Sequence, residues 1–245
     1  MVPHSSTDLP APKGFVTTHW SVVLAAGGSG ECHQALASLC RTYWFPLYAY
    51  VRRMGYAPPD AQDLTQDFFV RLLDRQLYRR ADRERGRFRT FLLTALRNFV
   101  LNQRDRQRTA RRGGGIELVS WEGLDAEGRF QSEARAELTP ERAYEKQWAL
   151  AVLDRVLDRL REEARRAGRV EPFDRLKRCV WGRTDPETYA TMARECGWTE
   201  SGVRVAVHRL RHRFRELLRA EIAHTVEHAE EVDAELRALI DIIAT

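Results

Sequence analysis

Residues 185–219 read DPETYATMARECGWTESGVRVAVHRLRHRFRELLR, and this stretch decides the fold of the second half of the chain. Asp185 and Pro186 suit the N-cap and first turn of a helix, and Gly197 supplies the left-handed residue that ends it. Thr199 can then cap a second helix. The spacing therefore predicts a helix-turn-helix. This motif needs a small residue for close helix contact, a glycine in the turn and an aliphatic residue in the core. Ala193, Gly197 and Val203 occupy these positions.

The second helix of this motif has two different faces. Its apolar stripe, spaced as in an α-helix, consists of Val203, Val207, Leu210, Phe214 and Leu217. The opposite face is rich in arginine, which is typical of a helix that enters a DNA groove. An amphipathic helix with a solvated basic face is the alternative, and the turn spacing favours DNA binding over it. The outward residues are Ser201, Arg204, Val205, His208, Arg209, His212 and Arg215.

Whole-chain composition agrees with nucleic-acid binding. Forty Lys and Arg against 35 Asp and Glu give a formal net charge of +5, and nearly all the basic residues are arginine, so their local clustering matters more than the total. The sequence contains no pattern that would pair a nucleophile with a catalytic base. It also contains no glycine-rich phosphate-binding loop and no spacing of zinc ligands. We therefore expect no enzyme activity, cofactor or metal. The four cysteines form no CxxC pair and are interpreted as thiols of a reducing cytosol.

The sequence also carries predictions about location. No run approaches the roughly 20 apolar residues that a membrane helix needs, and the first residues do not resemble a signal peptide. We therefore expect a cytoplasmic protein without membrane insertion.

Periodicity along the chain predicts an all-α fold with two helical domains joined by a flexible acidic linker. The first domain spans 17–112 and the second 139–225, where Thr139-Pro-Glu restarts a helix. Residues 1–16 are expected to be a disordered arm, and 226–245 an amphipathic tail of unknown role. The glycine-opened linker, 113–138, either imitates nucleic acid through its carboxylates or is a plain solvated tether; its composition does not decide between them.

A helix expected over 59–74 buries an apolar stripe and presents acidic residues on its far face. An acidic patch that contains a valine suits a basic protein surface better than it suits DNA. A solvated acidic face is the alternative for this helix taken alone. The residues of this face are Asp63, Gln66, Asp67, Val70 and Asp74.

A second helix is expected from Phe88 to about Arg104, with its phenylalanines buried. Arg97, Leu101 and Arg104 project outward from it. Further arginines, including Arg108, follow in the sequence. Guanidinium groups on such a face can hold phosphates, and the neighbouring polar and apolar side chains can receive unstacked bases. Phe88, Phe91 and Phe99 are assigned to the core rather than to base stacking.

Three segments of the chain, DAQDLTQDFF at 60–69, FRTFLLTALRN at 88–98, and residues 189–211, resemble in order three signature segments of bacterial RNA polymerase sigma factors. The likeness is to the sigma-70 superfamily and is closest to its two-domain extracytoplasmic-function class. It implies a region 2-like first domain, a region 4-like second domain, and a dissociable subunit that gives core RNA polymerase its promoter specificity without covalent chemistry of its own.

The resemblance implies a role for each interface. Asp63, Gln66 and Asp67 match the segment that docks on the clamp of the largest polymerase subunit, with Asp67 in place of the commoner glutamate. The second domain would contact the polymerase flap. The helix from Phe88 matches the segment that captures the −10 strand, with Phe91 where tryptophan is common. Its capture residues would be Arg97, Asn98, Leu101, Asn102, Arg104 and Arg108, and the −35 reader would use Ser201, Arg204, His208 and Arg211.

Two alternative functions stay open at this stage. A helix-turn-helix transcriptional regulator would bind promoter DNA without loading onto core polymerase, and it would have no need of the acidic helix at 59–74. A nucleic-acid-modifying enzyme with a fused helix-turn-helix lacks candidate chemistry. The sequence does not decide whether an anti-sigma protein or the linker and tail restrain the chain.

Overall fold

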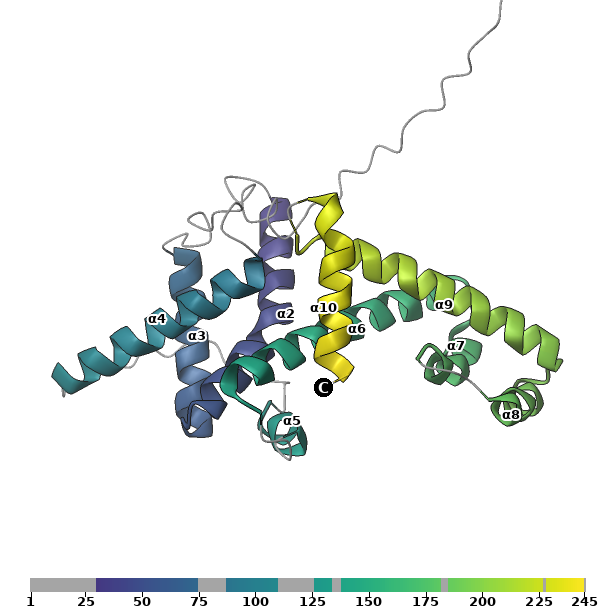
Figure 1. The fold of residues 1–245 in the computed structure, drawn as a ribbon, viewed down its shortest axis with the longest axis horizontal. Coiled ribbons are helices and arrows are strands. Elements are labelled where there is room, and N and C mark those ends of the chain that lie inside the picture. The colour runs from purple at the N-terminus through teal and green to yellow at the C-terminus, as the bar shows by residue number, and fades with distance from the viewer. Residues whose placement is uncertain are drawn as a thin grey trace, which may run out of the picture.

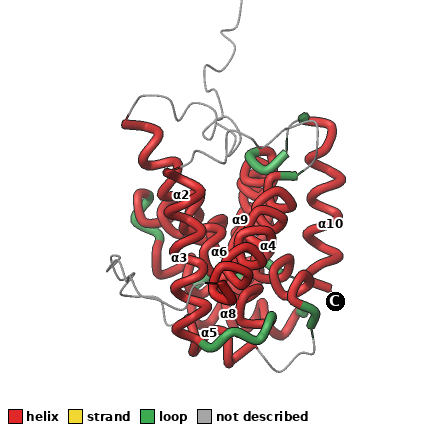
Figure 2. Tube along the Cα trace, turned by 90° about the vertical axis from the view of Figure 1, so that its left-hand side faces the viewer, coloured by secondary structure: helices red, strands yellow, loops and turns green. Residues whose placement is uncertain are grey.

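The computed structural model describes residues 30–74, 87–109, 126–133, 138–181, 185–226 and 228–244. Most of these residues lie in helices and none lies in a strand, which confirms the all-α prediction for the described part of the chain (Figures 1 and 2). The α-helices are α2 Gly30–Arg53, α3 Pro58–Asp74, α4 Phe88–Thr109, α5 Ala126–Glu133, α6 Pro140–Arg166, α7 Val170–Leu176, α8 Pro186–Cys196, α9 Glu200–Ala223 and α10 Val232–Ala244. Within the described ranges, 3₁₀ turns span Lys177–Cys179 and Ala229–Glu231.

The centre of the main core is α2, whose large apolar side chains, among them Tyr43 and Leu47, are fully buried. α3 packs on α2 through Phe68, and α4 adds Phe88, whose ring meets Tyr43 edge to face at 5.6 Å between centroids. Edge-to-face contacts of this kind stabilise the core beyond the burial of apolar area and favour one relative orientation of the rings. The three helices therefore form a packed unit that leaves one face of α3 and one face of α4 uncovered.

The long helix α6 begins where the sequence predicts. Thr139 is its N-cap and accepts a hydrogen bond from the backbone of Arg142, and Pro140 occupies the first turn. α6 packs against α2, α7, α9 and α10, so it bridges the two halves of the molecule. Its apolar stripe is buried and consists of Ala149, Val152, Leu153, Val156 and Leu160 (Ala149 and Val156 are fully buried).

Two hydrophobic clusters result. The larger one is continuous from α2–α4 through α6 to the second half of α9 and to α10, and it includes Phe88, Trp148, Phe214 and Leu239. The smaller one lies within α7–α9 and holds the helix-turn-helix together. α9 contributes to both, because Val203 lies in the smaller cluster and Phe214 in the larger, with Leu210 packed against each.

The described part of the predicted linker is not an unpacked tether. Residues 126–133 form α5, which lies against α2. Glu127 accepts hydrogen bonds from Tyr48 and Arg52, and the Arg52 guanidinium sits over the Phe130 ring, 4.7 Å from its centroid. The prediction of a flexible segment is therefore wrong for α5. Residues 113–125 and 134–137 of the linker, and the N-terminal arm, lie outside the described residues.

Residues 232–244 of the tail form the helix α10, which stands between the α2–α4 group and the α7–α9 group (Figure 1). The amphipathic character predicted for the tail is present, since Val232 and Leu239 are buried in the main core. Ile240 and Ile243 of the same helix are exposed.

Candidate nucleic-acid interface

The turn of the helix-turn-helix has the capping geometry that its sequence predicts. A carboxylate oxygen of Asp185 accepts from the backbone N–H of Thr188 at 2.7 Å, and Gly197 ends α8 with φ +66°. Thr199 caps α9 by accepting from the N–H of Gly202 at 3.1 Å. The caps satisfy backbone donors that a helix start leaves unpaired, and the left-handed glycine reverses the chain within three residues. These contacts fix the angle at which α9 leaves α8.

Close contact between α8 and α9 comes from small and aliphatic side chains. Ala193 and Met192 of α8 pack against Val203 and Val207 of α9, and all four are buried. This close packing of buried side chains holds the two helices rigidly together. The motif can therefore present the outer face of α9 as a fixed surface.

The outward face of α9 is where the sequence places it. Val205 is half exposed, at 50%, among polar and basic neighbours. Arg204 lies with its guanidinium 4.6 Å from the Tyr189 ring centroid and 3.8 Å from the Glu200 carboxylate, so its side chain is oriented before any ligand arrives. The exposed members of the set are Ser201, Arg204, Val205, His208, Arg209, His212 and Arg215.

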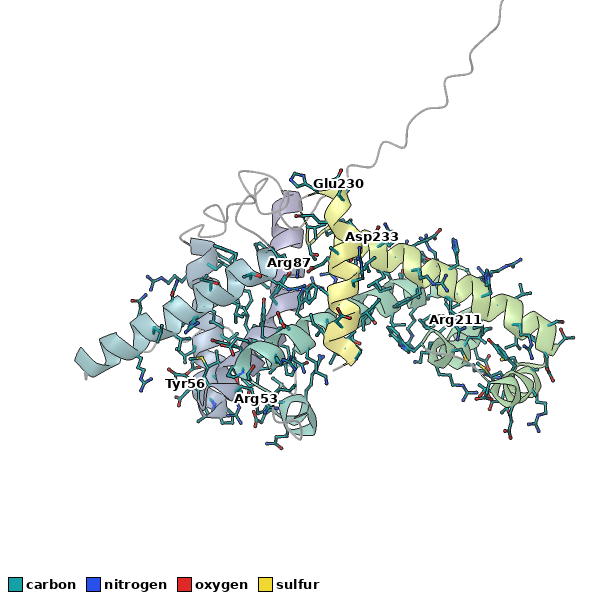
Figure 3. The ribbon with its side chains drawn as sticks, viewed as in Figure 1. Arg53, Tyr56, Arg87, Arg211, Glu230 and Asp233 are labelled. Carbon is teal, nitrogen blue, oxygen red and sulfur yellow. The ribbon has the colours of Figure 1, made fainter. Side chains whose placement is uncertain are left out.

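Arg211 is placed differently from the other candidate DNA contacts. It is half-buried, and its Nε donates to the carbonyl oxygen of Cys179 at 2.8 Å (labelled in Figure 3). That bond ties α9 to the 3₁₀ turn before α8. The structure thus gives Arg211 an internal contact that holds the recognition helix in place.

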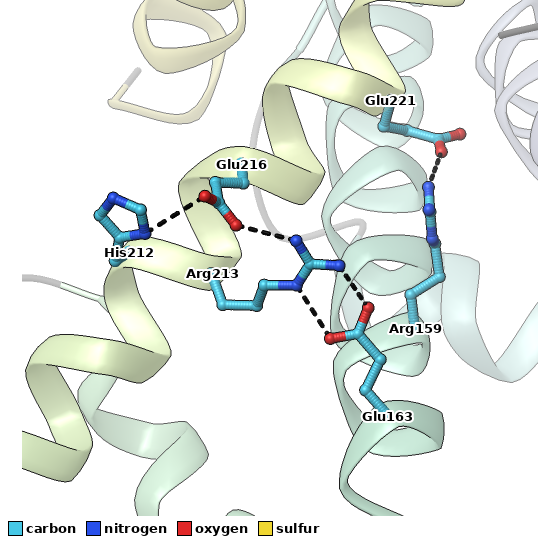
Figure 4. A network of polar contacts seen from close by, with 6 residues as sticks. All are labelled: Arg159, Glu163, His212, Arg213, Glu216 and Glu221. Carbon is cyan, nitrogen blue, oxygen red and sulfur yellow. Dashed lines mark hydrogen bonds and ion pairs between the residues drawn. The ribbon is translucent and has the colours of Figure 1, made fainter. Parts of the chain in front are cut away.

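A polar network on the other side of α9 joins it to α6 (Figure 4). Arg213 donates to both carboxylate oxygens of Glu163 at 2.7 and 3.0 Å and to Glu216 at 2.8 Å. This two-point geometry lowers the pKa of Glu163 and raises that of Arg213. Nearby, the buried Glu221 of α9 pairs with Arg155 and Arg159 of α6. The arginines of α9 therefore divide between an outward set and a set that anchors the helix.

The uncovered face of α4 carries the residues expected to capture a DNA strand. Leu101 is 46% exposed although it is apolar, and its neighbours on this face are polar or basic. The described exposed residues are Arg97, Asn98, Leu101, Asn102 and Arg104. Arg108 lies within α4, but its side chain is outside the described residues. Phe88 and Phe99 are buried and Phe91 is half-buried against Phe88, as the core assignment predicts.

The uncovered face of α3 is acidic. Asp63 and Asp67 are exposed one helical turn apart, while Gln66 and Val70 are half-buried. Partial burial and the charge of Asp63 raise the pKa of Asp67. A cationic partner would offset the repulsion between the two carboxylates, so this face is suited to binding a basic surface.

Comparison with known families identifies the unit that carries both of these faces. Residues 39–110, which cover most of α2 and all of α3 and α4, match the family model of sigma-70 region 2. The chain is thus similar to sigma-70 region 2 over this segment. The match supports a sigma-factor role in DNA binding and transcription initiation. Comparisons with curated proteins and with solved structures found no match.

The acidic face of α3 and the exposed face of α4 both lie within the segment that matches sigma-70 region 2, and the helix-turn-helix lies outside it. Within the described ranges, no group of His, Cys, Asp and Glu side chains could hold a metal ion. None of the helices in those ranges is long and apolar enough to cross a membrane.

Sequence reasoning missed the contacts that attach other parts of the chain to the segment that matches sigma-70 region 2. Arg52 holds α5 through Glu127, and Arg87 and Arg89 hold α10 through Glu235. The partners lie 75 residues apart in the first case and 146 residues apart between Arg89 and Glu235. No local spacing pattern could have signalled them.

Proposed function

We propose that this chain is a sigma factor of the extracytoplasmic-function class, which acts in the bacterial cytoplasm as a dissociable subunit of RNA polymerase. The observation that carries the proposal is the presence in one chain of a sigma-70 region 2 domain and a helix-turn-helix with an exposed basic recognition face. Such a subunit binds core polymerase, recognises two promoter elements and promotes opening of the duplex.

The α3 face is the proposed contact with the clamp of the largest polymerase subunit. Asp63 and Asp67 supply negative charge, and the half-buried Val70 supplies apolar contact area beside them. Charge complementarity of this kind gives specificity and a fast encounter with a basic surface. Gln66 completes the face with a group that can both donate and accept hydrogen bonds.

The α4 face is the proposed site for the −10 strand. Removing a base from the stack costs a few kcal/mol, which binding in a protein site can offset. Arg97 and Arg104 are placed to hold phosphates on either side of Leu101, while Asn98 and Asn102 can read base edges. The promoter opens because captured bases are withdrawn from pairing, and no covalent step is required.

The proposed −35 reader is α9, within a region 4-like domain over 139–225 that also contacts the flap of the polymerase. Ser201, Arg204 and His208 lie in its N-terminal half, the part that reaches base edges in this motif. Arg209, His212 and Arg215 lie farther along and are assigned to phosphates, with Val205 against an apolar group of a base. Arg211 is assigned to positioning α9.

Binding to core polymerase distinguishes this proposal from a promoter-binding regulator. Purified protein mixed with core enzyme should co-elute with it in gel filtration. The variant with Asp63→Lys and Asp67→Lys should lose at least about tenfold in affinity, because two charges that face a basic surface become repulsive. Its melting temperature should be nearly unchanged, because exposed charges contribute little to stability.

A matched control reverses charge away from this face, with Glu187→Lys and Glu230→Lys on exposed positions of α8 and the turn before α10. The control should bind core enzyme as the natural protein does. Co-elution of the α3 double variant at the natural level would contradict the docking assignment. Failure of the natural protein to bind core enzyme would favour the regulator.

A further inference from the structure

The tail helix α10 contacts both halves of the molecule. Its apolar side, through Val232 and Leu239, is buried in the main cluster against α6 and α9. Its polar contacts reach the start of α4 and the end of α9. In Figure 3 the start of α10, marked by Asp233, lies beside Arg87, which directly precedes α4.

The contact with α4 is a buried ion pair. Glu235 is only 1% exposed, and its carboxylate pairs with the guanidinium of Arg89, in the first turn of α4, and lies 2.9 Å from Nε of Arg87. The guanidinium of Arg89 also lies over the ring of Trp148 in α6, 4.1 Å from its centroid. The carbonyl of Arg89 accepts from the hydroxyl of Tyr144 in α6 at 2.9 Å. The start of α4 is thus held from two sides, by α6 and by α10.

The contact with α9 uses the neighbouring carboxylate of the same helix. Asp233 pairs with Arg219, which lies in the last third of α9. This pair is exposed and contributes little by itself. The pair matters because of where it lies. Asp233 and Glu235 belong to one turn of α10, and they form ion pairs with the two helices that carry the candidate DNA-binding faces.

We infer that α10 is a brace that fixes the −10-binding helix α4 relative to the −35-binding helix α9, and that Glu235 is the positioning residue of this brace. The contacts that make α10 a brace do not depend on the proposed function. The effect of the brace on promoter recognition does rest on it. Neither DNA-binding face is covered by α10, since Arg97 and Arg204 are exposed. The brace therefore sets the separation of two accessible surfaces.

A rigid connection makes the protein sensitive to the number of base pairs between the two elements. Each added base pair moves one element by about 3.4 Å along the DNA and turns it by about 35° around the axis. A protein whose two reading helices are fixed can match one spacer length, whereas a loosely joined pair tolerates several. Spacer preference is thus a property that Glu235 controls.

The first experiment measures the brace directly. Spin labels are attached through a non-natural amino acid at Thr94 of α4 and Glu187 of α8, both exposed, and the distance distribution between them is recorded in the full chain. The test variant is Glu235→Gln, which keeps the volume of the side chain and removes its charge. The control is Glu230→Gln, the same change at an exposed position three residues before Asp233.

The natural protein and Glu230→Gln should show one narrow distribution. Glu235→Gln should show a distribution at least about twofold wider, because Arg87 and Arg89 lose their counter-charge and α10 detaches from α4. If Glu235→Gln does not fold, Glu235→Asp, which keeps the charge on a shorter side chain, should give an intermediate width. An unchanged width in a folded variant would overturn the brace.

The second experiment measures transcription by core polymerase from promoters whose spacer is varied by up to two base pairs. Two base pairs should cost the natural protein and Glu230→Gln about tenfold in product, and Glu235→Gln about threefold or less. A proportional rise or fall of Glu235→Gln on every spacer would overturn the positioning role. No product with any of the proteins would count against the proposed function, and the distance measurement would still decide the brace.

Discussion

Arg204 and Arg215 occupy the same exposed face of α9 at different distances from its N-terminus. Replacing Arg204 by alanine should cost on the order of 1–3 kcal/mol in binding and relax preference at one or two positions of the −35 element. Replacing Arg215 should weaken binding to all sequences alike and flatten the dependence on salt, since a phosphate contact releases counterions whatever the base. Fluorescence anisotropy with a set of −35 duplexes at several salt concentrations measures both effects.

Arg219→Ala provides the control for a loss of positive charge on α9, because Arg219 pairs with Asp233 away from the reading face. It should leave sequence preference unchanged. Equal effects of Arg204→Ala and Arg215→Ala on preference would show that the two arginines do not divide the work in this way.

Individual side chains show where residue-level prediction succeeds. Helical periodicity alone placed Arg97 and Arg204 on exposed faces, because burial of the opposite stripe determines which side faces solvent. Val70 was predicted to face outward, and Arg211 was expected to contact the −35 element, but both are half-buried. Their surroundings are set by contacts with other elements, as the bond from Arg211 to Cys179 shows, and these do not follow from the helix's own sequence.

Helix α5 gives a prediction at the scale of an element. Hydrogen bonds from Arg52 and Tyr48 lower the pKa of Glu127 from 4.5 to about 2, so the folded protein favours the ionised form. The stabilisation that follows is complete above pH 4.5 and disappears as the pH falls toward about 2. Glu127→Gln should therefore lower the free energy of unfolding by about 1 kcal/mol at neutral pH. This figure is reduced for the screening of charges by solvent at this partly exposed site.

Urea unfolding of the natural protein and of Glu127→Gln across this pH range measures that cost. The difference between their free energies of unfolding should shrink as the pH falls from 4.5 toward 2. Glu230→Gln, exposed and without this ion pair, should show no such trend. A difference that stays constant with pH would mean that the Arg52–Glu127 pair does not hold α5.

The elements themselves were predictable where caps and periodicity coincide. The caps Thr139, Asp185, Gly197 and Thr199 all function as their residue types predict. α5 was missed because an eight-residue helix is unstable by itself and forms through its contacts with α2. Its carboxylate Glu127 is occupied by Arg52, so it is not one of the free charges that a nucleic-acid mimic in the linker would use.

At the scale of the whole molecule, the sequence predicted the helical class but not how the parts are joined. Local patterns define faces of single helices, and the cluster that runs from Phe88 through Trp148 to Phe214 depends on which faces meet. The role of the tail could not be predicted either, because it depends on the ion pairs that Glu235 forms with Arg87 and Arg89 in the folded protein. Long-range ion pairs of this kind require the folded structure.

The central claim, that this chain directs RNA polymerase to promoters, is tested most directly by run-off transcription. Core enzyme alone and core enzyme with added protein are compared on promoter DNA selected by the protein. Addition of the protein should give a full-length transcript that core enzyme alone does not make, and the variant with Asp63→Lys and Asp67→Lys should give far less of it. Binding to the promoter DNA without any new transcript would contradict the account.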